Sequence, residues 1–229
     1  MKMLLTFLIL LSVGICASCQ SPGYSQSETE ECNYLALGDS YTIGESVSED
    51  ERYPNQLAEA LSDTNGTVFK AQIIARTGWT TGDLKEAIRE ANIGNRKYEL
   101  VTLLIGVNNE FQHLGEDEYA VEFRELLMQA IGFAGDRKER VVVISIPDYG
   151  YTPFGSDRQA AISARIDRFN KINKQITESM SVKYVSITEI SRQGLKDPAL
   201  VASDGLHPSG KMYQKWVELL VGEWQDFYK

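Results

Sequence analysis

The sequence has few histidines and lacks several signature motifs of enzymes. Two histidines occur among its 229 residues, which argues against a zinc site built from several imidazoles. The motifs G-x-S-x-G and H-E-x-x-H are missing, and no G-x-G-x-x-G or P-loop pattern follows a predicted strand. These absences argue against an α/β-hydrolase nucleophile elbow, a zinc protease and a nucleotide-binding site.

Positive charge is also scarce. The 23 Lys and Arg residues face 32 Asp and Glu residues, for a formal net charge of −9. That balance argues against binding of nucleic acid, or of an anionic membrane, through a basic surface. With 43 % hydrophobic residues the composition is globular, and the length suits one domain of about 200 residues with a substantial core.

The N-terminus lacks an apolar run of the about 20 residues that a membrane span needs. Lys2 instead precedes a shorter apolar run over residues 4–16, and small residues follow. This is the pattern of a secretory signal peptide, so we predict that residues 1–18 are a signal peptide.

The end of this leader resembles a bacterial lipoprotein signal. Small residues, Ala17 and Ser18, stand directly before Cys19, although Cys16 occupies a position where leucine is usual. The resemblance implies an exported protein of the periplasm or cell envelope, attached to a membrane through lipidated Cys19. Ordinary cleavage near Ala17, without a lipid, is the alternative.

Residues 19–32 have almost nothing to bury and are rich in Ser, Glu, Pro and Gly. We predict that this stretch is a flexible tether and that residues 33–229 form the folded domain. Cys32 is then a structural thiol if Cys19 is lipidated, or a disulfide partner of Cys19 if it is not.

Apolar runs and amphipathic stretches alternate through residues 33–229. Strands are predicted at residues 34–37, 68–75, 100–105, 141–146 and 183–187. Helices are predicted at residues 54–61, 84–93, 119–133, 158–180 and 211–227. This alternation predicts an α/β fold with a parallel sheet that is covered by helices on both faces.

Ligands of such sheets bind at the carboxyl ends of the strands. Gly38-Asp39-Ser40 follows the first strand, Gly78 lies after the second, and Asn108 follows the third. The loop before the last helix carries Asp204 and His207. Taken alone, Gly78 and Asn108 are more typical of turns or helix caps than of an oxyanion site, and Gly, Asp and Ser are common turn residues as well.

Together these residues supply the parts of an acyl-transfer site. The Ser40 hydroxyl needs an adjacent base, and His207 has Asp204 three residues earlier to orient its imidazole. His113 lies in a polar loop and is expected to be a surface histidine. Backbone N–H groups of Ser40 and Gly78 and the Asn108 amide are candidates to bind an oxyanion.

The segments GDSY, Gly78, GVNN and DGLH are similar, in order and spacing, to the four sequence blocks of the SGNH hydrolases, also called GDSL esterases and lipases. The resemblance covers residues 34 to about 210. It implies a nucleophile at Ser40, oxyanion donors at Gly78 and Asn108, and His207 as base with Asp204 as its partner. It also implies a flavodoxin-like three-layer α/β/α sandwich with a mostly parallel five-stranded sheet, no metal and no organic cofactor.

Two positions depart from the family pattern. Tyr41 stands where leucine gives the GDSL name, and Asn109 replaces the aspartate common in the third block. Neither position is expected to carry the chemistry. Several loop residues could line a substrate pocket or cover the sheet edge, and these are Trp79, Tyr149, Tyr151 and Phe154.

The function predicted is that of a serine hydrolase acting on carboxylic esters. Because the loops after the strands are short and form no apolar lid, short-acyl or carbohydrate esters are favoured as substrates. A binding lipoprotein on the same fold, and an acyltransferase or lysophospholipase using the same site, are the alternatives.

Overall fold

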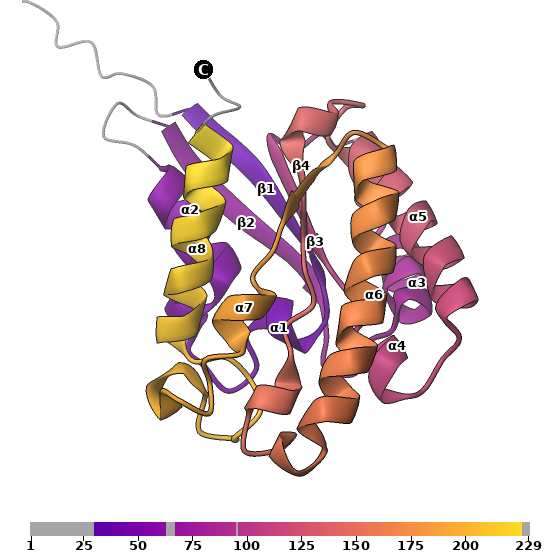
Figure 1. Cartoon of the computed structure of the whole chain (residues 1–229). Helices are drawn as coiled ribbons and strands as arrows, with labels where there is room; N and C mark the ends of the chain where they lie inside the picture. Colours follow the sequence, from indigo (N-terminus) through magenta and orange to yellow (C-terminus); the bar gives the residue numbers. More distant parts are fainter. Residues whose placement is uncertain (1–29, 63–66, 95, 226–229) are drawn as a thin grey trace, which may run out of the picture.

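The computed structural model describes residues 30–62, 67–94 and 96–225. Its centre is a five-stranded sheet in the order β2-β1-β3-β4-β5, in which every neighbouring pair of strands is parallel (Figure 1). The strands are β1 (Glu30–Gly38), β2 (Thr67–Ala75), β3 (Leu100–Leu104), β4 (Val141–Ile144) and β5 (Lys183–Val185). Every residue of β3 and β4 is buried, as expected of strands covered on both faces.

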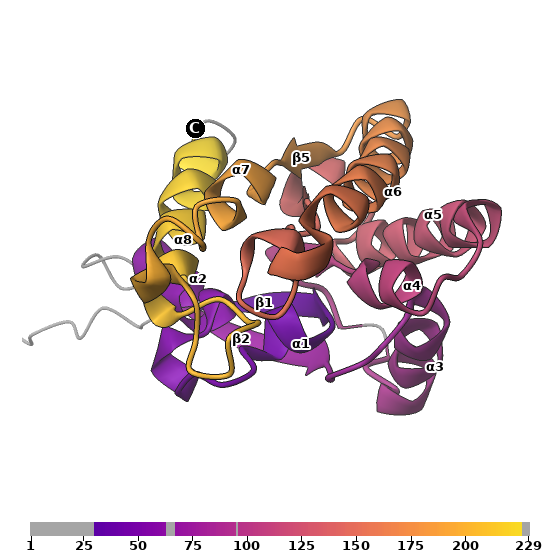
Figure 2. The ribbon, with the colours of Figure 1, turned by 60° about the horizontal axis from the view of Figure 1, so that its bottom comes forward.

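Helices cover both faces of the sheet. The long ones are α2 (Tyr53–Leu61), α3 (Thr81–Ala91), α5 (Glu116–Phe133), α6 (Gln159–Ser179) and α8 (Gly210–Gln225). Helices α2 and α8 lie on one face, and α3, α5 and α6 lie on the other (Figures 1 and 2). The predicted three-layer α/β/α sandwich is therefore confirmed.

The first strand is longer than the sequence predicted. Strand β1 begins at Glu30, and its first residues pair with β2 from Glu30↔Thr67 to Cys32↔Phe69. The predicted tether over residues 19–32 is thus too long by three residues. Glu30 and Glu31 are not apolar, so the sequence pattern did not mark them as part of a strand. Main-chain pairing with β2 does not require apolar side chains. The predicted signal peptide and Cys19 lie outside the described residues.

Three short helices follow strands where only loops were expected. They are α1 (Ser40–Ile43), α4 (Val107–Phe111) and α7 (Thr188–Ser191). One turn is too short for a periodic apolar pattern, so the sequence could not distinguish these helices from turns. No helix in the described ranges is both long and apolar enough to cross a membrane.

The strand register aligns three carboxyl ends. Gly38, the last residue of β1, pairs with Ala75 of β2 on one side and with Leu104 of β3 on the other. The chain leaves β1 toward β2 and later passes to β3, so the strand order reverses at β1. Sheets of this order bind ligands in the crevice at that reversal.

Candidate active site

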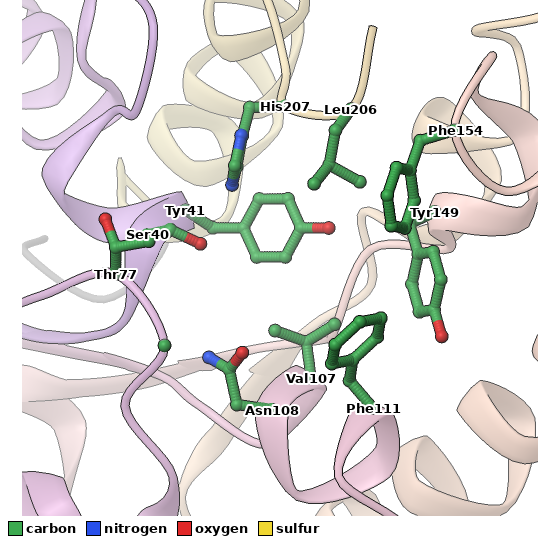
Figure 3. A pocket seen from close by; sticks show the side chains of 11 residues that line it. Ser40, Tyr41, Thr77, Val107, Asn108, Phe111, Tyr149, Phe154, Leu206 and His207 are labelled. Atoms are coloured by element: carbon green, nitrogen blue, oxygen red, sulfur yellow. The ribbon is translucent and has the colours of Figure 1, made fainter. Parts of the chain in front are cut away.

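A pocket of about 250 Å³ lies at this edge of the sheet (Figure 3). It is lined by Ser40, Tyr41, Thr77, Gly78, Val107, Asn108, Phe111, Tyr149, Phe154, Leu206 and His207. Four of the five residues predicted as catalytic or oxyanion-binding are among them. The fifth, Asp204, contacts the pocket through His207.

Ser40 is the first residue of α1, and the side chain of Asp39 caps that helix by accepting a hydrogen bond from the backbone N–H of Tyr41 at 3.0 Å. The chain turns so tightly here that Gly38 has no room for a side chain. A Cβ on Gly38 would lie 2.0 Å from Oγ1 of Thr42. In the Gly-Asp-Ser sequence, Gly38 allows the chain to pass close to Thr42, Asp39 caps α1, and Ser40 carries the hydroxyl.

His207 and Asp204 lie in one tight loop. Nδ1 of His207 is 2.6 Å from Oδ2 of Asp204, while Oδ1 accepts hydrogen bonds from the backbone N–H groups of Leu206 and His207 at 2.9 and 3.0 Å. Burial raises the pKa of Asp204, but the hydrogen bonds from His207, Leu206 and Ser46 outweigh burial and hold that pKa well below its usual value. Asp204 is therefore a carboxylate whenever the site operates near neutral pH.

Ser40 and His207 lie on the same side of the pocket, and the second ring nitrogen of His207 lies on the side of Ser40 (Figure 3). No hydrogen bond joins the two side chains among the described residues. Such bonds are commonly long without substrate and shorten when it binds. His113 is exposed, as predicted, and does not line the pocket.

The three residues predicted to donate to an oxyanion all line the pocket. The backbone N–H groups of Ser40 and Gly78 make no hydrogen bond within the described chain. Asn108 donates one N–H of its amide to the carbonyl of Trp79 at 2.9 Å. This bond orients the amide, and its second N–H is left to bind a ligand.

Gly78 has a positive φ of 84°, so a side chain there would be strained although no neighbouring atom would clash with it. The backbone conformation, and not a lack of space, therefore explains glycine at this position.

The two departures from the family pattern have structural roles. Asn109 is buried and bonds Thr81 twice, accepting from its N–H at 3.0 Å and donating to its hydroxyl at 2.7 Å. It thereby fixes the start of α3. The ring of Tyr41 packs edge-on against the ring of His207, with the ring centres 5.5 Å apart.

An aromatic cluster forms the wall opposite Ser40 (Figure 3). Phe111, Tyr149 and Phe154 contact one another with ring centres 6.1–6.3 Å apart. The hydroxyl of Tyr149 donates to the buried carboxylate of Glu110 at 2.8 Å, and Arg165 forms an ion pair with the same carboxylate. Tyr149 is thus held in place, whereas Phe111 and Phe154 are each 47 % exposed.

The sequence prediction identified Tyr149 and Phe154 as candidate pocket residues. It missed the five other lining residues, which are Tyr41, Thr77, Val107, Phe111 and Leu206. Trp79 and Tyr151, the other two candidates, do not line the pocket. Phe111 and Val107 belong to the short helix α4, which the sequence could not distinguish from a turn; the position of this segment after β3 was the signal that could have found them.

Asp148 holds the loop that follows β4. Its carboxylate accepts a hydrogen bond from the N–H of Gly150 at 2.9 Å and forms an ion pair with Arg192 at 3.0 Å. Within residues 30–62, 67–94 and 96–225, no three His, Cys, Asp or Glu side chains are grouped so as to hold a metal ion.

The chain is similar to known proteins in sequence and in fold. A sequence model of the GDSL-like Lipase/Acylhydrolase family matches residues 36–215. No curated protein sequence matches the chain.

Solved structures share the fold at low sequence identity. LAE5, an α/β hydrolase from the metagenome of Lake Arreo in Spain, superimposes with a TM-score of 0.66 at 17 % identity, over 86 % of this chain and 96 % of that one. The psychrotrophic esterase EstA from a Pseudoalteromonas species gives 0.65 at 14 % identity, over 86 % and 98 %. Axe2, an acetylxylan esterase from Geobacillus stearothermophilus, gives 0.62 at 21 % identity, over 86 % and 96 %.

Proposed function

The chain belongs to the GDSL-like lipase/acylhydrolase family and is an SGNH-type carboxylic ester hydrolase, and from that premise we propose that Ser40, His207 and Asp204 carry out its reaction. The observation that supports this assignment is that Ser40 and His207 line one pocket at the carboxyl ends of β1 and β3. The 2.6 Å contact between Asp204 and His207 supports it further.

In the proposed mechanism, Nε2 of His207 takes the proton of the Ser40 hydroxyl as Oγ attacks the ester carbonyl. Asp204 holds the other ring nitrogen and stabilises the imidazolium that forms. The imidazolium then gives its proton to the departing alcohol, which leaves an acyl group on Ser40. A water molecule, deprotonated by His207, releases the acid by the reverse sequence of proton transfers.

The oxyanion of each tetrahedral intermediate is proposed to lie between the N–H groups of Ser40 and Gly78 and the amide of Asn108. Loss of one such donor costs about 10²–10³ in kcat. Asn108→Ala should therefore lower kcat by that factor and leave KM nearly unchanged. A variant with unchanged kcat and an unaltered circular dichroism spectrum would remove Asn108 from the mechanism.

We propose short-acyl esters or acylated carbohydrates as the substrate class. The volume of about 250 Å³ lies below the roughly 300–1,000 Å³ of pockets for drug-sized ligands. None of the eleven lining residues is Lys, Arg, Asp or Glu, which favours a neutral substrate. The exposed rings of Phe111 and Phe154 offer apolar faces to an acyl group or a sugar ring. Axe2, which shares the fold, is an acetylxylan esterase.

The test is hydrolysis of p-nitrophenyl esters from acetate to palmitate, followed by acetylated oligosaccharides. Ser40→Ala should abolish turnover, whereas Ser156→Ala, at an exposed serine of a neighbouring loop, should retain it. We expect activity to be highest on short acyl chains. Full activity in Ser40→Ala would refute the nucleophile, and a preference for palmitate would refute the substrate class.

Export and lipid attachment through Cys19 remain part of the proposal. The support is the sequence pattern of residues 1–19, which lie outside the described structure. In a bacterial host, the protein should fractionate with membranes, and Cys19→Ala should release it. Membrane association that does not depend on Cys19 would contradict a lipid anchor.

A further inference from the structure

Residues 44–46, directly after α1, have an unusual backbone. Gly44 and Ser46 both have left-handed φ values, 66° and 65°. Glycine ends helices this way routinely, but the conformation is uncommon for serine. A residue kept in a strained conformation calls for an explanation in terms of what its side chain contacts.

The Ser46 hydroxyl donates a hydrogen bond of 2.8 Å to Oδ2 of Asp204, the same oxygen that contacts Nδ1 of His207. The two residues are 158 positions apart in the sequence. All other hydrogen bonds to Asp204 within the described chain come from Leu206 and His207, in its own loop. Ser46 therefore joins the Asp204 loop to the part of the chain that carries Ser40.

Glu45 anchors the 44–46 segment at two points. Its backbone N–H donates to the carbonyl of Ser40 at 3.0 Å, which ties the segment to the nucleophile helix α1. Its carboxylate accepts a hydrogen bond from the hydroxyl of Thr77, directly before Gly78. The residue directly before Ser46 is consequently held by two contacts, although the side chain of Ser46 itself lies at the surface.

We infer that Ser46 is a positioning residue that fixes the Asp204 carboxylate, and through it the His207 ring, relative to Ser40. The inference rests on the proposed function, in which Asp204 and His207 act on Ser40. A hydrogen bond to a charged group is stronger than one between neutral groups, and two donors on one oxygen restrict the rotation of the carboxylate. Without the Ser46 hydroxyl, the Asp204 loop keeps its internal bonds and the packing of His207 against Tyr41, but the Asp204 carboxylate loses its hydrogen bond to the 44–46 segment.

Ser46→Gly is the sharpest test, because it removes the hydroxyl and relieves the strained backbone at the same time. Ser181→Gly is a matched control, since Ser181 is exposed, has a φ of 58° and lies outside the pocket. We expect Ser46→Gly to lower kcat at least about tenfold, with KM within about twofold and a melting temperature no lower than that of the parent. Ser181→Gly should leave kcat and KM unchanged.

Ser46→Ala distinguishes the effect of the hydroxyl from the effect of the backbone conformation. It removes the hydroxyl but keeps a Cβ atom at this position. The same loss of kcat in Ser46→Ala and Ser46→Gly supports the positioning role. Loss in the glycine variant alone would assign the effect to backbone freedom and overturn the inference. Unchanged kcat in both variants would overturn it as well.

A second readout does not depend on turnover. Of the two histidines, His207 alone has a hydrogen-bonded Nδ1 in the described structure, so one downfield imidazole proton resonance is expected in the NMR spectrum. That resonance should shift or broaden in Ser46→Gly and remain in place in Ser181→Gly. If Asp204→Asn is fully active, the proposed function itself fails; if Asp204→Asn is inactive while Ser46→Gly is normal, only the present inference fails.

Discussion

Two aspartates flank the reacting groups, and their surroundings affect them in opposite ways. Asp39, directly before Ser40, is fully buried. One of its oxygens accepts a hydrogen bond from the N–H of Tyr41, and the other has no hydrogen-bond partner in the described chain. Burial raises the pKa of Asp39 to about 7. Asp204 has a lowered pKa, although burial alone would raise its pKa too.

The two carboxylates differ in how deeply they are buried and in how many donors they have. Asp39 is fully buried, whereas the side chain of Asp204 is partly exposed. Oxygens of Asp204 accept from His207, Leu206 and Ser46, and these bonds compensate for the water that burial removes. Asp39 lacks that compensation on one oxygen, so its neutral form is favoured. The same side chain can therefore serve as a lasting negative charge beside the imidazole or as a helix cap that readily takes up a proton.

The largest effect is expected from Asp204→Asn. The amide keeps the shape of the carboxylate but removes the negative charge and favours the wrong tautomer of His207. A substitution of this kind costs about 10⁴ in kcat. Steady-state kinetics on a short-chain ester would measure it, with Asp197→Asn, at an aspartate outside the pocket, as the control. A loss below about tenfold would show that Asp204 is not the catalytic partner of His207.

The second effect is on stability and should come from Asp39→Asn. In the unfolded chain the pKa of Asp39 returns to 3.8, while in the folded protein it is about 7. Between these values the folded state binds more protons, so this group makes the protein less stable as pH rises from 4 to 7. The difference between the two pKa values corresponds to about 4 kcal/mol of unfolding free energy, lost as the pH rises.

Asparagine cannot ionise, so Asp39→Asn should remove the loss of stability that the parent protein shows as the pH rises from 4 to 7. Urea unfolding at pH 4.5 and pH 8 would measure the difference, and the exposed Asp157→Asn would serve as the control. Parallel pH profiles for the parent and Asp39→Asn would mean that Asp39 keeps an ordinary pKa and that the contrast with Asp204 does not exist.

The smallest effect is expected from Tyr41, which contacts Asp39 and also His207, the partner of Asp204. Its N–H bonds Asp39, and its ring packs against His207. An aromatic pair of this kind is worth about 0.5–1.5 kcal/mol, so Tyr41→Leu should lower kcat by about threefold to tenfold. Tyr41→Phe keeps the ring and should behave like the parent enzyme. Equal activity of the two variants would show that the ring does not orient His207.

The sequence allowed much of this site to be predicted because its parts follow strand ends. Ser40, Gly78 and Asn108 line the same pocket, as their places after three parallel strands led us to expect. The contact of Asp204 with His207 followed from their spacing of three residues, and the structure has it at 2.6 Å. Their catalytic roles stay predictions until the variants are measured.

Other features gave no signal in the sequence. The pairing of Glu30–Cys32 with β2 depends on main-chain hydrogen bonds, which any residue except proline can make. The aromatic cluster joins Phe111 of α4 to Phe154, two residues from segments that follow different strands. Their contact depends on strand order, which no local pattern specifies.

The sequence by itself determined the local features: amphipathic helices, buried strands, the cap before Ser40 and the short loop that joins Asp204 to His207. These depend on residues within a few positions of one another. The tertiary structure alone decided that β1 stands at the reversal of strand order, that Ser46 bonds Asp204 across 158 positions, and that Asp39 is buried with an unpartnered oxygen. Long-range packing fixes these features, because both the loss of water around a charge and the partners that replace it come from distant segments of the chain.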